Sequence, residues 1–244
     1  MEDKIFGRNP VLEAIKNGRE IDKIMIKKGG VEGSLNVIIK KAKEKGIVIS
    51  EVDKQKLDAL SEGENHQGVV AFAATHQYAT VRDILNRAKE KNHAPFVIIC
   101  DKITDPHNLG SIIRTANCAG VDGIIIPKRN SVGLNMIVAK TSAGAVEYTP
   151  VAKVTNIANT IDELKKEGFW IAGADMDGES MYKTDLKGAL GLVVGSEGEG
   201  ISRLVKEKCD FIVNIPMSGE INSLNASVAA GILMYEAVRQ RVDN

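Results

Sequence analysis

The chain contains few cysteines, and none of them form a motif. Its 244 residues hold three, Cys100, Cys118 and Cys209, far apart and without a CxxC pair. An odd number at wide spacing argues against a disulfide framework and against a zinc ribbon. We therefore expect all three to serve as small buried hydrophobic side chains.

Metal-binding and hydrolytic motifs are also absent from the sequence. The four histidines, His66, His76, His93 and His107, have no metal-ligand spacing. Neither an HExxH pattern nor a Ser-His-Asp arrangement is visible, so no metal site is expected.

Long apolar runs and a signal-peptide core are missing too. No run approaches the roughly 20 apolar residues that are needed to cross a bilayer. The first ten residues, MEDKIFGRNP, contain no apolar signal segment. The chain is therefore expected to stay in the cytoplasm and off the membrane.

Charge of one sign is not in excess, because 32 Lys/Arg balance 32 Asp/Glu. The balance is uneven, with 17 basic and 14 acidic residues in 1–93 against 15 and 18 in 94–244. A run of four lysines at 40–45 fits a solvated helix face better than a phosphate-binding surface. Composition alone does not indicate a nucleic-acid-binding protein.

The first third of the chain predicts a small α/β domain. Residues 21–27, 47–52 and 68–73 have the patterns of strands, and 34–45 that of a helix with Ser34 as its N-cap. A more polar stretch with a helical run at 81–91 follows and ends at Pro95. We expect a domain at 1–75, a linker at 76–94 and a second domain at 95–244.

The second domain alternates apolar strands with helices. Continuous apolar strands separated by helices indicate a parallel sheet that is covered on both faces. The predicted strands are 96–100, 123–126, 169–173, 190–194 and 211–215, and helices are predicted at 108–119, 155–167 and 201–208.

Three polar loops follow predicted strands, where the ligands of open α/β sheets bind. In the first, residues 101–120, Asp105-Pro106 favours a turn, so Asn108 can cap the helix that carries Arg114. Arg114 is then either an ordinary surface residue or a fixed guanidinium that faces a phosphate or a developing oxyanion.

The second loop, GSEGEG at 195–200, comes directly after a strand. Its glycines allow a ligand to approach the backbone closely, and its order matches neither a P-loop nor GxGxxG. Glu197 and Glu199 would repel a phosphate, but they suit a cofactor with hydroxyls, an amine or a positive centre. The alternative is a plain strand-to-helix turn.

The third loop opens the segment 215–237, IPMSGEINSLNASVAAGILMYEA. Asn222, Ser223 and Asn225 cluster where a helix of small residues begins, so a capped core helix is one interpretation. The three loops together predict instead that these residues form one wall of a single site.

The three loops, in this order, resemble the motifs of the SpoU, or TrmH-type, RNA ribose 2′-O-methyltransferases. The matching segments are D-P-H-N-L-G-x-I-x-R-T-A (105–116), V-G-S-E-G-E-G (194–200) and I-P-M-x-G-x-x-x-S-L-N-x-S-V-A (215–229). Two upstream segments, G-R-N-P-V-L-E-A (7–14) and N-H-Q-G (65–68), resemble the substrate-binding domain of the subgroup that methylates a guanosine in 23S rRNA. The resemblance covers the whole chain and departs at Ala226, where relatives often have Val.

The resemblance implies a fold and a set of partners. It implies a SPOUT-type, trefoil-knotted parallel-sheet domain at 95–244 behind an N-terminal α/β domain like ribosomal protein L30, and a homodimer. Sequence physics alone predicts no knot. The implied cofactor is S-adenosylmethionine, which leaves as S-adenosylhomocysteine and contacts Gly195, Ile215 and Leu224.

The resemblance also implies the polar residues of the active site: Asn108, Arg114, Glu197, Ser223 and Asn225. The family proposal makes Arg114 the base, although a guanidinium holds its proton with a pKa above about 12. We prefer a role in which Arg114 binds the target phosphate and stabilises the incipient alkoxide.

Three other functions remain open from the sequence. A tRNA ribose methyltransferase of the same family is the nearest, although tRNA-acting relatives often replace the N-terminal domain with short extensions. A non-catalytic RNA-binding assembly factor would not need the intact polar set. A nucleotide-dependent oxidoreductase would need a GxGxxG, which is missing.

Overall fold

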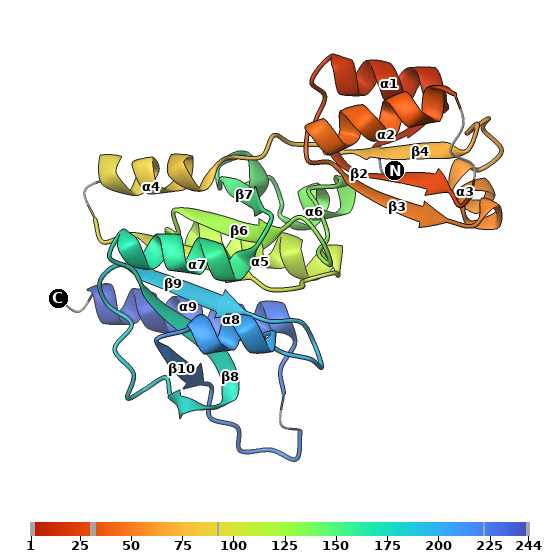
Figure 1. The fold of residues 1–244 in the computed structure, drawn as a ribbon. Coiled ribbons are helices and arrows are strands. Elements are labelled where there is room, and N and C mark those ends of the chain that lie inside the picture. The colour runs from red at the N-terminus through yellow and green to blue at the C-terminus, as the bar shows by residue number, and fades with distance from the viewer. Residues whose placement is uncertain (1–2, 30–32, 92, 222, 243–244) are drawn as a thin grey trace. The chain divides into compact units, whose positions relative to one another are not determined.

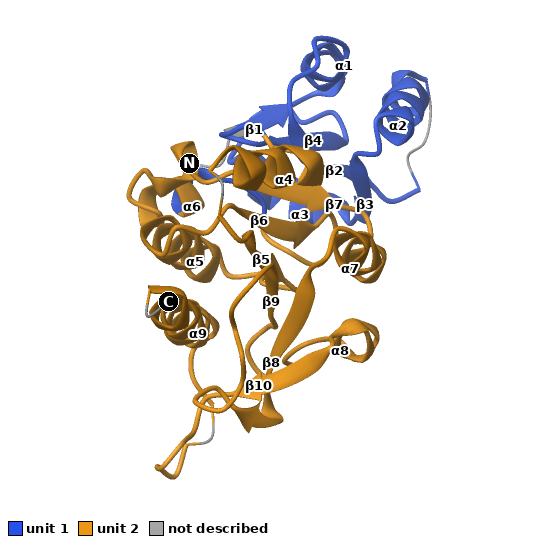
Figure 2. Cartoon of the chain, turned by 90° about the vertical axis from the view of Figure 1, so that its left-hand side faces the viewer, with its two compact units in different colours: residues 1–77, 133–137 blue, residues 78–132, 138–244 orange. Residues whose placement is uncertain are grey.

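The computed structural model describes residues 3–29, 33–91, 93–221 and 223–242. It divides the chain into two compact units, one formed by residues 1–77 and 133–137, the other by 78–132 and 138–244 (Figure 2). The prediction of a parallel-sheet α/β domain behind a smaller α/β domain is confirmed. Within the described residues no helix is long and apolar enough to cross a membrane.

The N-terminal unit is a mixed sheet with helices on both faces. Its elements are β1 (Asp3–Phe6), α1 (Arg8–Lys16), β2 (Ile21–Lys27), α2 (Ser34–Glu44), β3 (Val48–Val52), α3 (Lys54–Ser61) and β4 (Val69–Ala73). The strand order is β1-β4-β2-β3, and β2 and β3 run parallel. The sequence patterns did not predict β1, α1 or α3, and the predicted cap is wrong by one residue because Gly33, not Ser34, precedes α2.

Strand β4 separates two cores of the N-terminal unit because its side chains alternate between the faces of the sheet. Val69 and Ala71 pack with α1 and α2, whereas Val70 and Phe72 pack with Leu57 of α3. The five β4 residues are all buried, as the uninterrupted apolar run predicts.

The second unit is built on a six-stranded sheet in which every pair is parallel, in the order β10-β8-β9-β5-β6-β7 (Figure 1). Its strands are β5 (Phe96–Cys100), β6 (Gly123–Pro127), β7 (Val151–Val154), β8 (Trp170–Ser180), β9 (Leu190–Val194) and β10 (Phe211–Asn214). Its helices are α4 (Val81–Glu90), α5 (Pro106–Cys118), α6 (Met136–Thr141, which begins in the first unit), η1 (Ala145–Glu147), α7 (Ile157–Lys166), α8 (Arg203–Lys208) and α9 (Ala226–Val242). The sequence patterns missed β7 and the second half of β8.

Helices cover both faces of this sheet, as predicted. Ile84 of α4, Ile161 of α7 and Val205 of α8 share one core with Ile99 and Val193 of the central strands. Helices α5 and α9 lie together on the opposite face (Figure 2). Buried β5, which lies between β9 and β6, therefore carries the loop that leads into α5 from the middle of the sheet.

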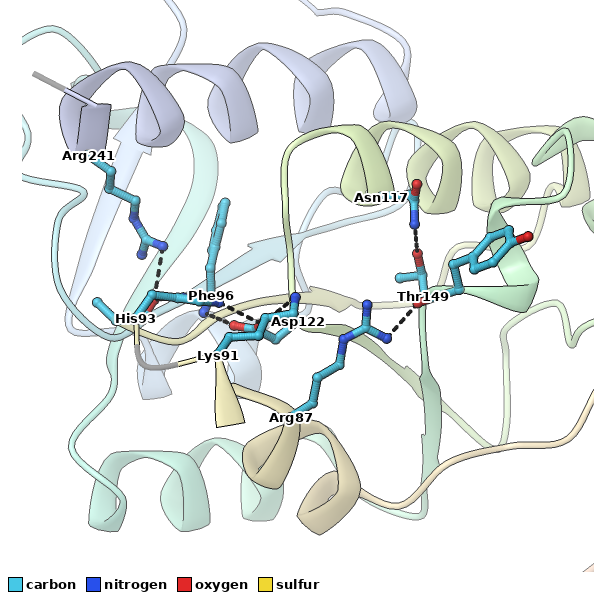
Figure 3. Close-up of polar contacts among 10 residues, drawn as sticks. Arg87, Lys91, His93, Phe96, Asn117, Asp122, Thr149 and Arg241 are labelled. Atoms are coloured by element: carbon cyan, nitrogen blue, oxygen red, sulfur yellow. Dashed lines mark hydrogen bonds and ion pairs between the residues drawn. The ribbon is translucent and has the colours of Figure 1, made fainter. Parts of the chain in front are cut away.

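A buried carboxylate fixes the start of β5. Asp122, which is fully buried, accepts hydrogen bonds from the backbone N–H of Phe96 at 2.9 Å and from Lys91 Nζ at 3.2 Å, and its Oδ1 lies 3.1 Å from His93 Nε2 (Figure 3). The Arg241 guanidinium lies 4.5 Å from the Phe96 ring centre and donates to the carbonyls of Ala94 and Gly188. These contacts hold the end of α9 against the start of β5.

The three cysteines are free thiols with different environments. Only Cys100 is fully buried, and burial, with the nearby Asp101 carboxylate, raises the pKa of its thiol to about 12. Cys209 is half-buried and Cys118 is exposed. The expectation of three buried hydrophobic side chains is therefore wrong for Cys118, which lies at the end of α5.

Candidate functional site at the carboxyl ends of the strands

The three polar loops leave the same edge of the second unit's sheet. They follow β5, β9 and β10, and because all the strands are parallel, their carboxyl ends lie on one side. Strand β9 pairs directly with β5, and β8 alone separates it from β10. The topology thus confirms that the loops share an edge.

Side chains from all three loops meet in one hydrogen-bonded triangle. Asn108 Nδ2 donates to Glu197 Oε1 at 2.9 Å, and Asn225 Nδ2 donates to Asn108 Oδ1 at 2.8 Å and to Glu197 Oε1 at 2.5 Å. The backbone N–H of Ala226 also lies 3.4 Å from Glu197 Oε1. Each amide thus donates and accepts in a consistent sense, and one carboxylate oxygen collects three donors.

Asn108 enters the triangle from inside a helix rather than from a cap. Asp105 is the N-cap of α5 and accepts from the His107 N–H at 2.8 Å, and Pro106 opens the helix. The expectation that Asn108 caps the helix is therefore wrong. The reason is that the Asp-Pro pair starts the helix earlier, which places Asn108 in the first turn with only 6% of its surface exposed.

The Glu197 loop depends on its glycines. Ser196 and Gly200 exchange two backbone hydrogen bonds of 3.1 and 3.0 Å, so the loop closes on itself. A Cβ on Gly195 would lie 2.0 Å from the carbonyl carbon of Gly200, which no side chain tolerates. Gly198 has φ +86°, in the left-handed region that favours glycine. The glycines therefore allow the loop to close tightly on its own backbone.

Asn225 both caps α9 and joins the triangle, two roles that were alternative interpretations of the sequence. Its Oδ1 accepts from Ser227 N, Ser227 Oγ and Val228 N, so it caps α9. Its Nδ2 simultaneously joins Asn108 and Glu197. Capping fixes the amide in the orientation that the triangle needs.

The remaining predicted residues that the structure describes have no hydrogen bond to the triangle. Ser223 and Leu224 are exposed, Leu224 at 37%, and Ile215 is half-buried just after β10. Asn222 lies outside the described residues. Arg114 is exposed on α5, six positions and thus a different helix face from Asn108. Within the described part of the chain, no ion pair to Arg114 is found.

Two contacts near the site were not predicted. Buried Asp101 accepts from the Ser202 N–H at 2.7 Å, which ties the β5 loop to the end of the glycine loop. Lys102 pairs with Glu199 at 3.2 Å. The signal was available, because Asp101 follows directly on a fully apolar strand, where a carboxylate needs a partner.

A second charge cluster lies on the long strand β8. Lys206 pairs with Asp175 at 3.0 Å and with Asp177 at 3.5 Å. Burial raises the pKa of Asp175, but hydrogen bonds from Lys206 and two backbone N–H groups outweigh it, so the pKa lies below its ordinary value. The hydrogen bond to Asp175 correspondingly raises the pKa of Lys206.

The loops also carry apolar and charged side chains. Among the described residues, no group of three His, Cys, Asp or Glu side chains could hold a metal ion. Met217 and Leu224 are exposed and Ile215 is half-buried, so the third loop presents apolar side chains. Of the two carboxylates in the glycine loop, Glu197 accepts the donors of the triangle and Glu199 pairs with Lys102.

Two family models and a curated relative match most of this chain. Residues 95–235 match the model described as "SpoU rRNA Methylase family", and residues 4–79 match "RNA 2'-O ribose methyltransferase substrate binding". A relative from Bacillus subtilis, named "Putative TrmH family tRNA/rRNA methyltransferase YacO", is 49% identical over 240 residues, 98% of this chain and 96% of its own length.

Solved structures show the same fold. The AdoMet-bound rRNA methyltransferase from Sinorhizobium meliloti superposes with a TM-score of 0.61 at 24% identity, covering 97% of this chain and 86% of its own. The TrmH/SpoU tRNA modifying enzyme from A. aeolicus reaches 0.56 at 28% identity, but covers only 66% of this chain and 85% of its own.

Proposed function

Because this chain belongs to the SpoU rRNA Methylase family, we propose that it methylates a ribose 2′-hydroxyl of RNA, with a guanosine of 23S rRNA as the target. Family membership makes it an RNA methyltransferase. The observation that carries the proposal is the triangle of Asn108, Glu197 and Asn225, which joins the three polar loops at one sheet edge.

The proposed cofactor is S-adenosylmethionine, which supplies an electrophilic methyl group on a sulfonium. Gly195, Ile215 and Leu224 would hold it: Gly195 allows the glycine loop to keep its closed shape, and the two apolar side chains would receive its ring. The carboxylate of Glu197 suits the positive charge of the sulfonium. The fold is shared with a structure that is named as AdoMet-bound, which supports this choice.

The chain's own groups must align the ribose and stabilise the oxygen as its proton leaves. Arg114 is exposed on α5, so its guanidinium can bind the phosphate beside the target ribose and stabilise the incipient alkoxide. Asn108, held by two hydrogen bonds, keeps the loop in place. Ser223 and Asn225 complete the polar wall on the α9 side.

The choice of rRNA over tRNA rests on the N-terminal unit. The structure named as a tRNA modifying enzyme covers 66% of this chain, whereas the one named as an rRNA methyltransferase covers 97%. Residues 4–79 match a substrate-binding family model, which supports a separate RNA-binding domain. A tRNA target is the second candidate, because the B. subtilis relative is named for both substrates.

The proposal includes the assembly and its location. We propose an RNA-binding domain at 1–75, a linker at 76–94 and a cofactor-binding domain at 95–244, the last carrying a trefoil knot. Val228 and Tyr235 on α9 are 48% and 50% exposed, which fits a homodimer contact through this helix. The proposed location is the cytoplasm.

Purified protein with methyl-labelled cofactor tests the function. Incubation with unmodified 23S rRNA transcripts and with tRNA, followed by digestion to nucleosides, should give labelled 2′-O-methylguanosine from the rRNA alone. Label in tRNA would show that tRNA, the second candidate, is the substrate in place of 23S rRNA. No label in either RNA, with RNA binding intact, would leave a non-catalytic RNA-binding protein.

A further inference from the structure

A polar hollow of about 1000 Å³ lies in the N-terminal unit, at the point where three helices begin. Arg8, Ser34 and Lys54, the first residues of α1, α2 and α3, all line it. The loop at 64–68, just before β4, forms another wall. We propose that this hollow binds one unpaired nucleotide of the RNA; this rests on the proposed function, because it takes RNA as the substrate.

The hollow is suited to a phosphate. Arg8, Lys27 and Lys54 line it, and among the described residues none of the three takes part in an ion pair. None of the three helices has a side-chain hydrogen bond at its N-cap, so no capping side chain covers the positive ends of their dipoles. Helix N-termini and cations both favour an anion.

The acids of the lining do not cancel this preference. Asp58 accepts from His66 Nε2 at 2.8 Å, so its charge is engaged on the wall. Glu64 is exposed, which leaves three cations against two carboxylates. A carboxylate beside the phosphate subsite also discriminates between ligands, because it accepts from base amino groups and repels a second phosphate.

The wall at 66–68 is preorganised. Gly68 N–H donates to His66 Nδ1 at 3.0 Å, so the ring's other nitrogen carries the proton and donates to Asp58. Arg8 N donates to Gln67 Oε1 and Arg8 Nε donates to the Gln67 carbonyl, each at 3.0 Å. These bonds fix the Arg8 plane and leave its terminal nitrogens for a ligand.

An unpaired nucleotide fits this arrangement better than a duplex. Duplex RNA is recognised by shape across a shallow groove, whereas proteins read unpaired nucleotides by inserting them among polar and planar groups. The hollow is concave, and the exposed amides of Asn9 and Asn65 on its rim can pair with a base edge. The fixed Arg8 guanidinium supplies a plane on which a base can stack.

The matching of residues 4–79 to a substrate-binding family model is independent support, because that range contains every lining residue named here. The match names a domain but no position in it. The hollow gives the position and the chemistry: a phosphate held by three cations, with a base on the amide rim.

Fluorescence anisotropy of the full chain with a labelled RNA hairpin carrying an open loop tests the proposal. Lys27→Ala/Lys54→Ala should weaken binding about tenfold and reduce the salt slope by up to roughly 0.7, the value for one phosphate contact on a single strand. The matched control is Lys40→Ala/Lys43→Ala, which removes the same charge from exposed α2 positions outside the hollow. It should change affinity by less than about twofold, within the weak general effect of surface charge.

Three outcomes overturn the proposal: equal losses in both double variants, no loss in the first, or equal affinity of the wild type for the same sequence fully paired. Thermal unfolding of each variant keeps folding failure apart from loss of binding. Failure of the proposed function looks different. In that case the wild type transfers no methyl group to RNA, while its binding still depends on Lys27 and Lys54.

Discussion

Asn225 donates a hydrogen bond to Asn108 at 2.8 Å, although 117 positions separate them in the chain. The bond connects the cap of α9 to the first turn of α5, the two helices that cover one face of the sheet. Glu197 receives a donor from each of them and so brings in the loop after β9. One small polar network thereby sets the positions of all three loops.

The two asparagines should be energetically coupled. Asn108→Ala leaves buried partners unsatisfied and should lower the free energy of unfolding by about 1–3 kcal/mol. Asn225→Ala loses the helix cap as well, at about 1 kcal/mol. A double-mutant cycle by urea unfolding should give a coupling above about 0.5 kcal/mol. Asn159→Ala, at an exposed position of α7, is the control, and strict additivity would contradict the network.

Gly195→Ala should abolish cofactor binding. The new Cβ would lie 2.0 Å from the Gly200 carbonyl carbon, so the loop from Ser196 to Gly200 must open. Calorimetry with S-adenosylmethionine measures the effect. Gly231→Ala is the matched control, because its Cβ meets only Thr115 at 3.6 Å within a helix, and it should keep affinity while stabilising the fold by up to about 1 kcal/mol. Unchanged cofactor affinity in Gly195→Ala would remove this loop from the site.

Arg114→Ala should lose methylation by a factor of at least about 100, the size of effect seen when a transition-state donor is removed. Its cofactor affinity and unfolding temperature should stay unchanged, because Arg114 is exposed. Single-turnover rates with labelled cofactor measure the loss of methylation, and calorimetry measures the cofactor affinity. Arg203→Ala, whose side chain is 93% exposed, should keep full activity. Loss of cofactor binding in Arg114→Ala would contradict a role toward the RNA.

Acid should destabilise the second unit partly through Glu236. Hydrogen bonds from Arg239 at 3.0 and 2.8 Å, opposed by burial and assisted by Gln240, hold the pKa of Glu236 below its ordinary value. A depressed carboxyl pKa adds stability above the unfolded value of about 4.3, and that stability is lost as the pH falls through the folded value.

Glu236→Gln should therefore cost about 1 kcal/mol at pH 7, discounted because Arg239 is half exposed, and progressively less as the pH falls below about 4.3 and through the folded pKa. Unfolding by urea across this pH range measures the difference. Exposed Glu163→Gln serves as the comparison and should give a small, flat difference. If the difference in the free energy of unfolding between the wild type and Glu236→Gln stayed constant across the range, lost packing rather than lost charge would explain it.

The sequence predicted the parallel sheet because its strands are uninterrupted apolar runs. It missed α1 and α3, whose first residues line the hollow, since their apolar faces are short and lie between charged residues. β8 was predicted too short because residues 174–178, which include two aspartates and a glycine, leave the ladder between Gly173 and Glu179 before pairing with β10 resumes. Register shifts of this kind depend on the partner strand and leave no local pattern.

The site was easier to predict than its geometry. Motif order identified Asn108, Glu197 and Asn225, and the structure brings these three together. The role of Asn108 inside the helix could not be predicted, because an Asp-Pro start and an Asn cap differ by only three positions. Arg114, Ser223, Leu224 and Ile215 stay predictions, and so does the trefoil knot.

Mapping of ribose methylation across the rRNA and tRNA of cells with and without this chain tests the central claim most directly. The account predicts one guanosine 2′-O-methyl group in 23S rRNA that disappears without the chain. It should return with the wild-type chain and not with Arg114→Ala. An unchanged 23S rRNA map, or a methyl group lost from tRNA instead, would contradict the account.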